Sequence, residues 1–310
     1  MRYAPMAVEG GGVAARIDSV RRATTSTDRF ARRARKVTMS HEMHHFSMGM
    51  WVFFLACATS VVGSFVGLSC ARQSLTAPTA RGHRRWMAMA ALSVGGVAVW
   101  LMHFIGMMGF DIPGTAIRYA LGPTAFSVAL SVAATWFGLW LVSSRASWVN
   151  RVPSLARLLV GGLGMGLAVS LMHYSGMWAI RIQGSLEHDP SFVVASVAIG
   201  VVAATAALWL AQTADRWVLR VPAALLMGCA VVALHYTGMA GVRVEVDPTV
   251  PLPSGWTVTA LLFPSFVLGI AVLAVPIAAL LLAPSRGDMA LEEEFARWAT
   301  DDDASVPGRS

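Results

Sequence analysis

Residues 166–177 read GLAVSLMHYSGM, and two other stretches of the chain repeat this pattern. Residues 96–107 read GVAVWLMHFIGM, and residues 228–239 read GCAVVALHYTGM. Each copy carries a histidine followed by an aromatic residue, with a glycine three positions and a methionine four positions after the histidine. A glycine also stands seven positions before each histidine, and an alanine stands five before it. Three such copies on one chain indicate an internal repeat.

The repeated pattern predicts a helix with one specialised face. Because each residue of an α-helix turns by about 100°, positions −7, 0 and +4 relative to the histidine share a face. The glycines at −7 (Gly96, Gly166 and Gly228) are expected to be close-packing positions, as small residues are in membrane helices. Each repeat is therefore predicted to present a packing surface that ends in a His/Met pair.

The composition indicates a membrane protein. Hydrophobic residues make up 56% of the chain and charged residues 13%, whereas a soluble domain carries about 25% charged residues. The apolar residues fall into runs of about 20, the length that crosses a bilayer as a helix. We predict an all-α membrane protein with seven transmembrane helices built from a repeated helix-pair unit. The predicted spans are 48–70, 87–109, 121–143, 156–179, 191–212, 219–241 and 257–283.

Three regions are expected along the chain. Residues 1–46 form a basic segment, in which the first 40 residues hold nine of the 24 Lys and Arg residues. That segment has no apolar run of the signal-peptide type, and we expect it to be disordered. Residues 47–283 form the membrane domain, and residues 284–310 form a short acidic tail expected in the cytoplasm. With the charge of +7 confined to the first segment and to short loops, nucleic-acid binding is not expected.

The loop arginines predict the orientation. Nine lie in or next to the connections after spans one, three and five, and three lie in the connections after spans two, four and six. The first set is Arg72, Arg81, Arg84, Arg85, Arg145, Arg151, Arg157, Arg216 and Arg220, and the second is Arg118, Arg181 and Arg243. The chain is thus expected as a multi-pass protein of the bacterial inner membrane, with its N-terminus outside and its C-terminus in the cytoplasm. The basic N-terminal segment opposes this orientation, so either that segment crosses the membrane or translation starts at Met39 or Met43, and we favour the second interpretation.

This topology places the three repeated histidines at one depth, near the outer surface. The candidate metal ligands are His103, Met107, His173, Met177, His235 and Met239, together with Met102, Met172, His44 and His45. Imidazole and thioether groups together suit copper. Sequence leaves open whether one helix supplies a His/Met pair or three helices supply one His each.

Other side chains near the motif have weaker signals. Tyr174 and Tyr236 are candidates to orient an imidazole through their hydroxyl groups. His83 and His188 fall in predicted loops and are expected to be solvated. The three cysteines form no C-x-x-C motif and indicate neither a disulfide framework nor a zinc site.

The triplets Met172-His173-Tyr174, Met102-His103-Phe104 and Leu234-His235-Tyr236 resemble the MHYT family of bacterial integral membrane sensors. The resemblance covers roughly residues 44–283, with Phe104 and Leu234 departing from the family pattern. It implies a sensor whose outer-face Met, His and Tyr residues bind copper, and which senses oxygen, CO, NO or redox state through it. Many relatives are fused to cyclic-di-GMP enzymes. This chain is instead expected to signal to a separate cytoplasmic partner.

Two alternatives follow from the same residues. Two histidines on facing helices would suit the axial ligation of a b-type haem. A repeated helix pair also resembles the construction of a transporter for copper or a small molecule. Because no catalytic constellation is apparent in the spans, the chain is not expected to be an enzyme.

Overall fold

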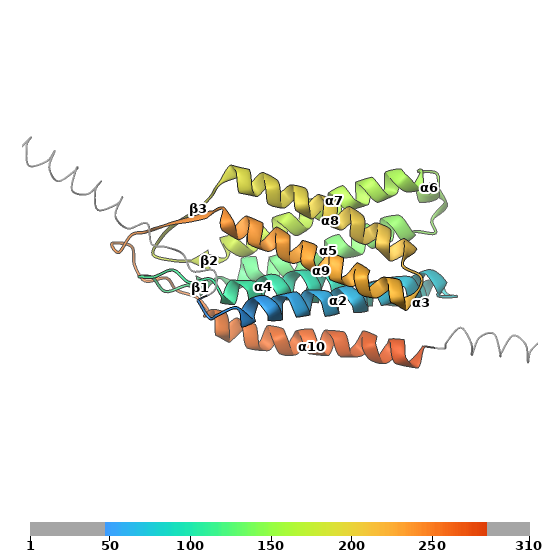
Figure 1. Cartoon of the computed structure of the whole chain (residues 1–310), viewed down its shortest axis with the longest axis horizontal. Helices are drawn as coiled ribbons and strands as arrows, with labels where there is room; N and C mark the ends of the chain where they lie inside the picture. Colours follow the sequence, from blue (N-terminus) through green and yellow to red (C-terminus); the bar gives the residue numbers. More distant parts are fainter. Residues whose placement is uncertain (1–46, 284–310) are drawn as a thin grey trace, which may run out of the picture.

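The computed structural model describes residues 47–283, which form a bundle of long helices (Figure 1). The first span is α2 (Trp51–Thr76), and the second is a continuous helix made of α3 (Ala80–Ala91), the π-helix η1 (Leu92–Leu101) and α4 (Met102–Met108). The others are α5 (Leu121–Ser143), α7 (Ser154–Trp178), α8 (Pro190–Thr213), α9 (Trp217–Ala240) and α10 (Val258–Leu282). All seven spans are long and apolar enough to cross a membrane. The predicted all-α membrane fold is confirmed.

Six of the spans form a closed ring. Contacts run from α2 to η1, then to α5, α7, α8 and α9, and from α9 back to α2. The helices that carry the histidines (η1 with α4, α7 and α9) alternate in this ring with α5, α8 and α2. The helix pairs η1–α5 and α7–α8 follow the predicted repeat, but the third pair does not. The place that α10 would take beside α9 is occupied by α2, and α10 packs outside the ring against η1 and α2 (Figure 1).

Short strands join the connections at one end of the bundle. The strand β1 (Arg118–Tyr119) pairs with β2 (Ile180–Arg181), and β3 (Gly184–His188) pairs with β4 (Val242–Val246), both antiparallel. Each ladder links connections that follow two different histidine-bearing helices. An ion pair of 2.7 Å between Arg243 and Asp189 lies beside the β3–β4 ladder. None of these strands was predicted from the sequence. The strands β1 and β2 are only two residues long, but Val242–Val246 alternates apolar and charged residues, which is the signal that could have identified β4.

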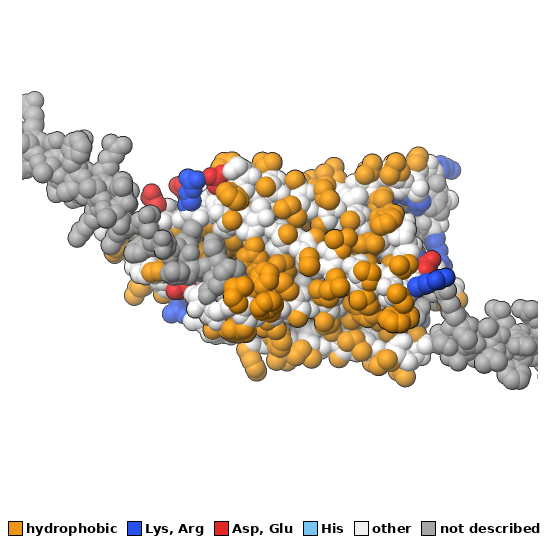
Figure 2. All heavy atoms as spheres, in the orientation of Figure 1, with side chains coloured by type: hydrophobic (Ala, Val, Ile, Leu, Met, Phe, Trp, Pro, Cys, Tyr) orange, Lys and Arg blue, Asp and Glu red, His pale blue; other side chains and the backbone are white. Residues whose placement is uncertain are grey.

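The surface is divided by side-chain type. Figure 2 shows hydrophobic side chains over the middle of the bundle and charged side chains gathered at its two ends. At the end opposite the strands, α2 continues beyond the predicted limit because Arg72 forms an ion pair with Asp215 and donates to the carbonyl of Gln212. Arg81, Arg84 and Arg85 likewise lie on α3, not in a loop. Hydropathy thus ended α2 too early and began the second span too late, because an arginine stem can follow an apolar helix to the interface.

Two of the three −7 glycines are close-packing positions, as predicted. A Cβ atom at Gly166 would lie 2.4 Å from Cα of Val201, and one at Gly228 would lie 2.6 Å from the side chain of Val61. In the second span Gly95 takes this role, since its Cβ would lie 2.6 Å from the carbonyl oxygen of Ser131. A Cβ at Gly96 would meet nothing nearer than 3.7 Å. The π-helical turn moves the histidine face by one residue, which the α-helical spacing could not anticipate.

Candidate metal centre

Three imidazoles meet inside the strand-bearing end of the bundle. His103 of α4, His173 of α7 and His235 of α9 are all buried. The Nδ1 atom of His103 lies 3.1 Å from Nδ1 of His235 and 3.2 Å from Nδ1 of His173. The ring centroids are 5.0 to 5.3 Å apart, with the rings edge to face. We call these residues the histidine triad.

Each triad ring rests on a glycine from another repeat. A Cβ atom at Gly176 would lie 2.5 Å from Nε2 of His103. One at Gly238 would lie 2.5 Å from Nε2 of His173, and one at Gly106 would lie 2.4 Å from Nε2 of His235. These are the +3 glycines of the motif, so the three repeats interlock in a cycle. With Nε2 turned toward a glycine backbone, Nδ1 is the ring nitrogen that each histidine presents to the centre.

Aromatic rings support two of the imidazoles from outside. The ring of Tyr174 packs edge to face on His173 at 5.0 Å, and that of Tyr236 packs on His235 at 4.9 Å. The hydroxyl of Tyr174 is hydrogen-bonded to Oγ of Ser196 at 2.6 Å, so this tyrosine positions His173 through its ring. Phe104 instead stacks on Trp100, with centroids 5.4 Å apart.

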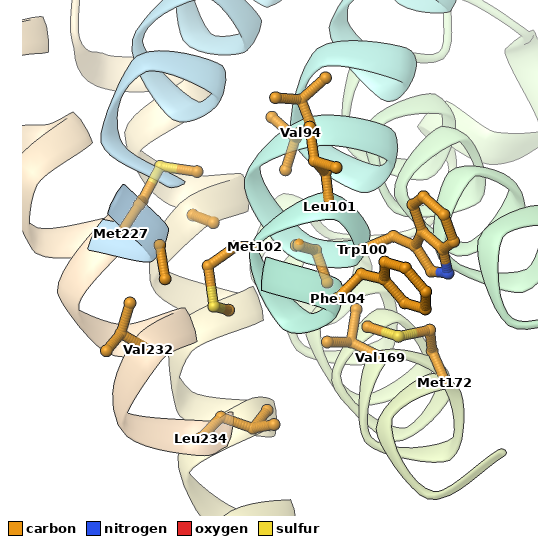
Figure 3. Close-up of a cluster of buried hydrophobic side chains, with 14 of the residues drawn as sticks. Val94, Trp100, Leu101, Met102, Phe104, Val169, Met172, Met227, Val232 and Leu234 are labelled. Atoms are coloured by element: carbon orange, nitrogen blue, oxygen red, sulfur yellow. The ribbon is translucent and has the colours of Figure 1, made fainter. Parts of the chain in front are cut away.

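The methionines of the motif belong to the apolar core. Met102 and Met172 are buried with the other apolar side chains of their helices (Figure 3). Met107, Met177 and Met239 are also core residues, each at most 2% exposed. Their role as ligands stays a prediction. The candidate ligands His44 and His45 lie outside the described residues 47–283.

The structure adds His188 to the surroundings of the triad. Its ring packs edge to face on Tyr174 at 5.3 Å, and its Nε2 atom is buried without a hydrogen bond. His188 is therefore half-buried, not fully solvated as was expected for a loop histidine. The expectation that His83 is solvated is wrong, because His83 is buried with Nδ1 2.7 Å from the carbonyl oxygen of Ser74. His188 lies outside the repeat, so no sequence pattern marked it. Strand pairing brings it to Tyr174.

The burial of His188 predicts a pH dependence of stability. Burial lowers the pKa of His188 below its usual value, so the unfolded chain takes up this proton first as the pH falls below about 6.5. The stabilisation is complete above that pH and is lost as the pH falls through the folded-state pKa. Between pH 7.5 and 5, melting curves should show a smaller loss of Tm for His188→Gln than for the unchanged protein, by about 1–3 °C. Equal losses would contradict the assignment.

The geometry of the triad fits one metal ion. Imidazole nitrogens bind transition metals such as zinc at about 2.0–2.1 Å, so two ligands about 3.1–3.2 Å apart would subtend an angle of about 100° at a shared ion. The potential ligand atoms of the three histidines all lie within 4.8 Å of one another, and among the described residues this cluster contains no carboxylate or thiol. Three neutral nitrogens suit copper, zinc, iron or nickel. A buried site without an anionic ligand favours the ion of lowest charge, which among these is Cu(I).

The same contacts disfavour a haem. Axial ligation by two histidines requires the macrocycle to lie between their rings. The triad rings touch one another directly, at 3.1 and 3.2 Å between nitrogens, and leave no gap for a macrocycle.

Comparison with known proteins identifies related sequences. The sequence profile described as "Bacterial signalling protein N terminal repeat" (MHYT) matches residues 96–153, 166–224 and 228–293. The first two matches begin at Gly96 and Gly166 and the third at Gly228, the −7 glycines of the repeat. No solved structure matches the chain.

The curated relatives are longer signalling proteins. The bifunctional diguanylate cyclase/cyclic di-GMP phosphodiesterase MucR of Pseudomonas aeruginosa is 37% identical over 190 residues, which is 59% of this chain and 26% of the relative. An uncharacterized signaling protein of Caulobacter vibrioides is 34% identical over 54% of this chain and 20% of its own length. The cyclic di-GMP phosphodiesterase NbdA of P. aeruginosa is 31% identical over 54% of this chain and 21% of its own length. The chain thus matches about a quarter or less of each relative's length.

Proposed function

Because the chain belongs to the MHYT family of bacterial signalling proteins, we propose that it is a membrane sensor that binds copper through Nδ1 of His103, His173 and His235. The observation that carries this proposal is the convergence of three buried imidazole nitrogens from three repeats on one point. Copper held by these residues would supply a redox-active centre able to bind a diatomic ligand such as oxygen, CO or NO. The protein contributes the ligands and a site closed to water.

The bundle suggests how occupancy of this site is transmitted. Each triad histidine lies near the end of a different helix, and each rests on a glycine of another repeat. Any adjustment of the three nitrogens on binding an ion would therefore change the packing of all three helices at once. These helices continue to the opposite end of the bundle, where Arg81 and Arg84 are exposed on α3. We propose this end as the cytoplasmic face and as the docking surface for a separate signalling partner.

Other functions are less well supported. A transporter of ions needs polar groups at successive depths of the membrane. The buried hydroxyls of Ser60 and Ser131 donate to the carbonyls of Ala98 and Gly95, and so they serve helix packing. The matches to the family profile cover the repeat alone, and we propose that this chain has no catalytic activity of its own.

Metal analysis tests the proposal. Detergent-purified protein, reconstituted with Cu(I), should retain about one copper per chain by mass spectrometry. The triple variant His103/His173/His235→Ala should retain none. The control is His83→Ala, which removes a buried histidine hydrogen-bonded to Ser74 outside the triad, and it should retain copper. Retention of copper by the triple variant would refute the proposal, and so would an unchanged protein that takes up no copper on reconstitution. A Soret band in the absorbance spectrum would point to haem.

A further inference from the structure

A small cavity lies next to the histidine triad, on the side that faces away from the short strands. It has a volume of about 30 Å³ and is lined by residues of η1, α7, α8 and α9. Val99, Val169 and Val231 line it, and each stands four residues before a triad histidine. Four residues are one helical turn, or about 6 Å. The three repeats thus place three equivalent valines between the cavity and the triad.

Two further cavities continue this space along the bundle. The second, of about 20 Å³, shares Val94, Met165, Ala207 and Met227 with the first. A third, of about 10 Å³, shares residues of α2, α5 and α8 with the second and reaches Gln212 at the end of α8 opposite the strands. Together they form a row from that end of the bundle to one turn from the triad. Figure 3 shows Val94, Val169, Met227 and Leu234, which line the first cavity, on three different elements.

The lining determines what the first cavity can hold. All of its lining residues are apolar aliphatic residues, methionine or glycine. A buried water requires two to four polar partners, whereas apolar cavities stay dry and take up molecules such as xenon. A charged or strongly polar molecule would lose its hydration without compensation. The volume of about 30 Å³ exceeds the roughly 10–15 Å³ that a single water requires, so the cavity has room for a molecule somewhat larger than water.

We propose that this cavity binds a small uncharged apolar molecule of the size of a dissolved diatomic gas. The row of cavities carries this molecule to the triad from the end of the bundle opposite the strands. Met165 and Met227 stand where the first two cavities meet. Methionine is flexible and adapts to irregular gaps, so these side chains let a molecule pass without a permanent channel. The proposal deepens the proposed function by giving the small ligand a binding cavity and a route to the triad. It rests on that function only for what happens at the triad.

Xenon is a direct probe of the cavity. The full chain in detergent would be titrated with xenon and followed by ¹²⁹Xe NMR, before any copper is added. Ala204 lines the first cavity on α8, so Ala204→Leu should fill it and weaken xenon binding at least tenfold. Ala198→Leu adds the same atoms to an exposed position of α8 and should leave xenon binding unchanged. Val169→Ala should enlarge the cavity and strengthen xenon binding severalfold. Because a folding defect would not strengthen binding, this variant tests the cavity even if Ala204→Leu fails to fold.

The outcomes separate this proposal from the proposed function. Equal xenon binding in Ala204→Leu, Val169→Ala and Ala198→Leu would overturn the cavity proposal, whatever the copper content. Saturable xenon binding that responds to the first two variants, in a protein that binds no copper, would support the cavity and refute the metal site. The route is tested by Ala207→Leu at the junction of the two cavities, which should slow xenon exchange. An unchanged exchange rate would overturn the route.

Discussion

His103→Ala is expected to lower the affinity for Cu(I) by at least about 100-fold. This loss exceeds the roughly 10- to 100-fold loss of metal affinity that is typical when a residue hydrogen-bonded to a metal ligand is replaced. The reason is geometric, because His103 is the triad member whose Nδ1 contacts both other Nδ1 atoms, at 3.1 and 3.2 Å. Its removal leaves two nitrogens and an opening in a buried site. Competition with a Cu(I) chelator of known affinity measures this change.

Tyr174→Phe serves as the matched control for that substitution. It keeps the ring that packs on His173 and removes only the hydroxyl that is bonded to Ser196. Its Cu(I) affinity should therefore change by less than about 10-fold. If His103→Ala binds Cu(I) as tightly as the unchanged protein, the ion is held elsewhere and the triad is a packing device.

Gly176→Ala is expected to destabilise the folded protein and to weaken Cu(I) binding together. The new Cβ would lie 2.5 Å from Nε2 of His103, so either the ring or the helix must move. Overpacking of this kind costs about 1–3 kcal/mol, which exceeds the stabilisation of about 1 kcal/mol that alanine brings to a helix interior. The expected fall in Tm is a few degrees, measured by thermal unfolding in detergent.

Gly164→Ala in the same helix is the control for this second prediction. A Cβ at Gly164 would meet only the Phe137 ring, at the ordinary distance of 3.6 Å. The control should be neutral or slightly more stable and should bind Cu(I) normally. Similar behaviour of the two alanine variants would show that the triad does not depend on the close contact with glycine.

The sequence alone predicted most of the fold. Seven spans follow from hydropathy, because the bilayer requires long apolar runs. The alignment of the three histidines follows from the repeat, since equivalent residues on equivalent helices reach the same depth. The helix ends at Arg72 and Arg81 were missed because their charges are accommodated at the interface. The exchange of α2 for α10 in the ring depends on long-range packing that no local pattern records.

The sequence predicted the site less completely. The motif identified His103, His173 and His235, but it could not tell a His/Met pair on one helix from three histidines in contact. That choice depends on the close approach of three helices, which Gly106 and Gly176 permit because neither has a Cβ atom to meet the rings of His235 and His103. The π-helical shift at Gly95 and the arrival of His188 by strand pairing were also beyond sequence reasoning.

X-ray absorption spectroscopy at the copper edge tests the three-histidine site most directly. Protein loaded with one Cu(I) should show nitrogen neighbours at about 2.0 Å, with the outer-shell scattering of imidazole rings fitted by three histidines. His103→Ala should reduce that number to two or lose the ion. A first shell dominated by sulfur at about 2.3 Å would contradict the proposed site and assign the ion to the methionines instead.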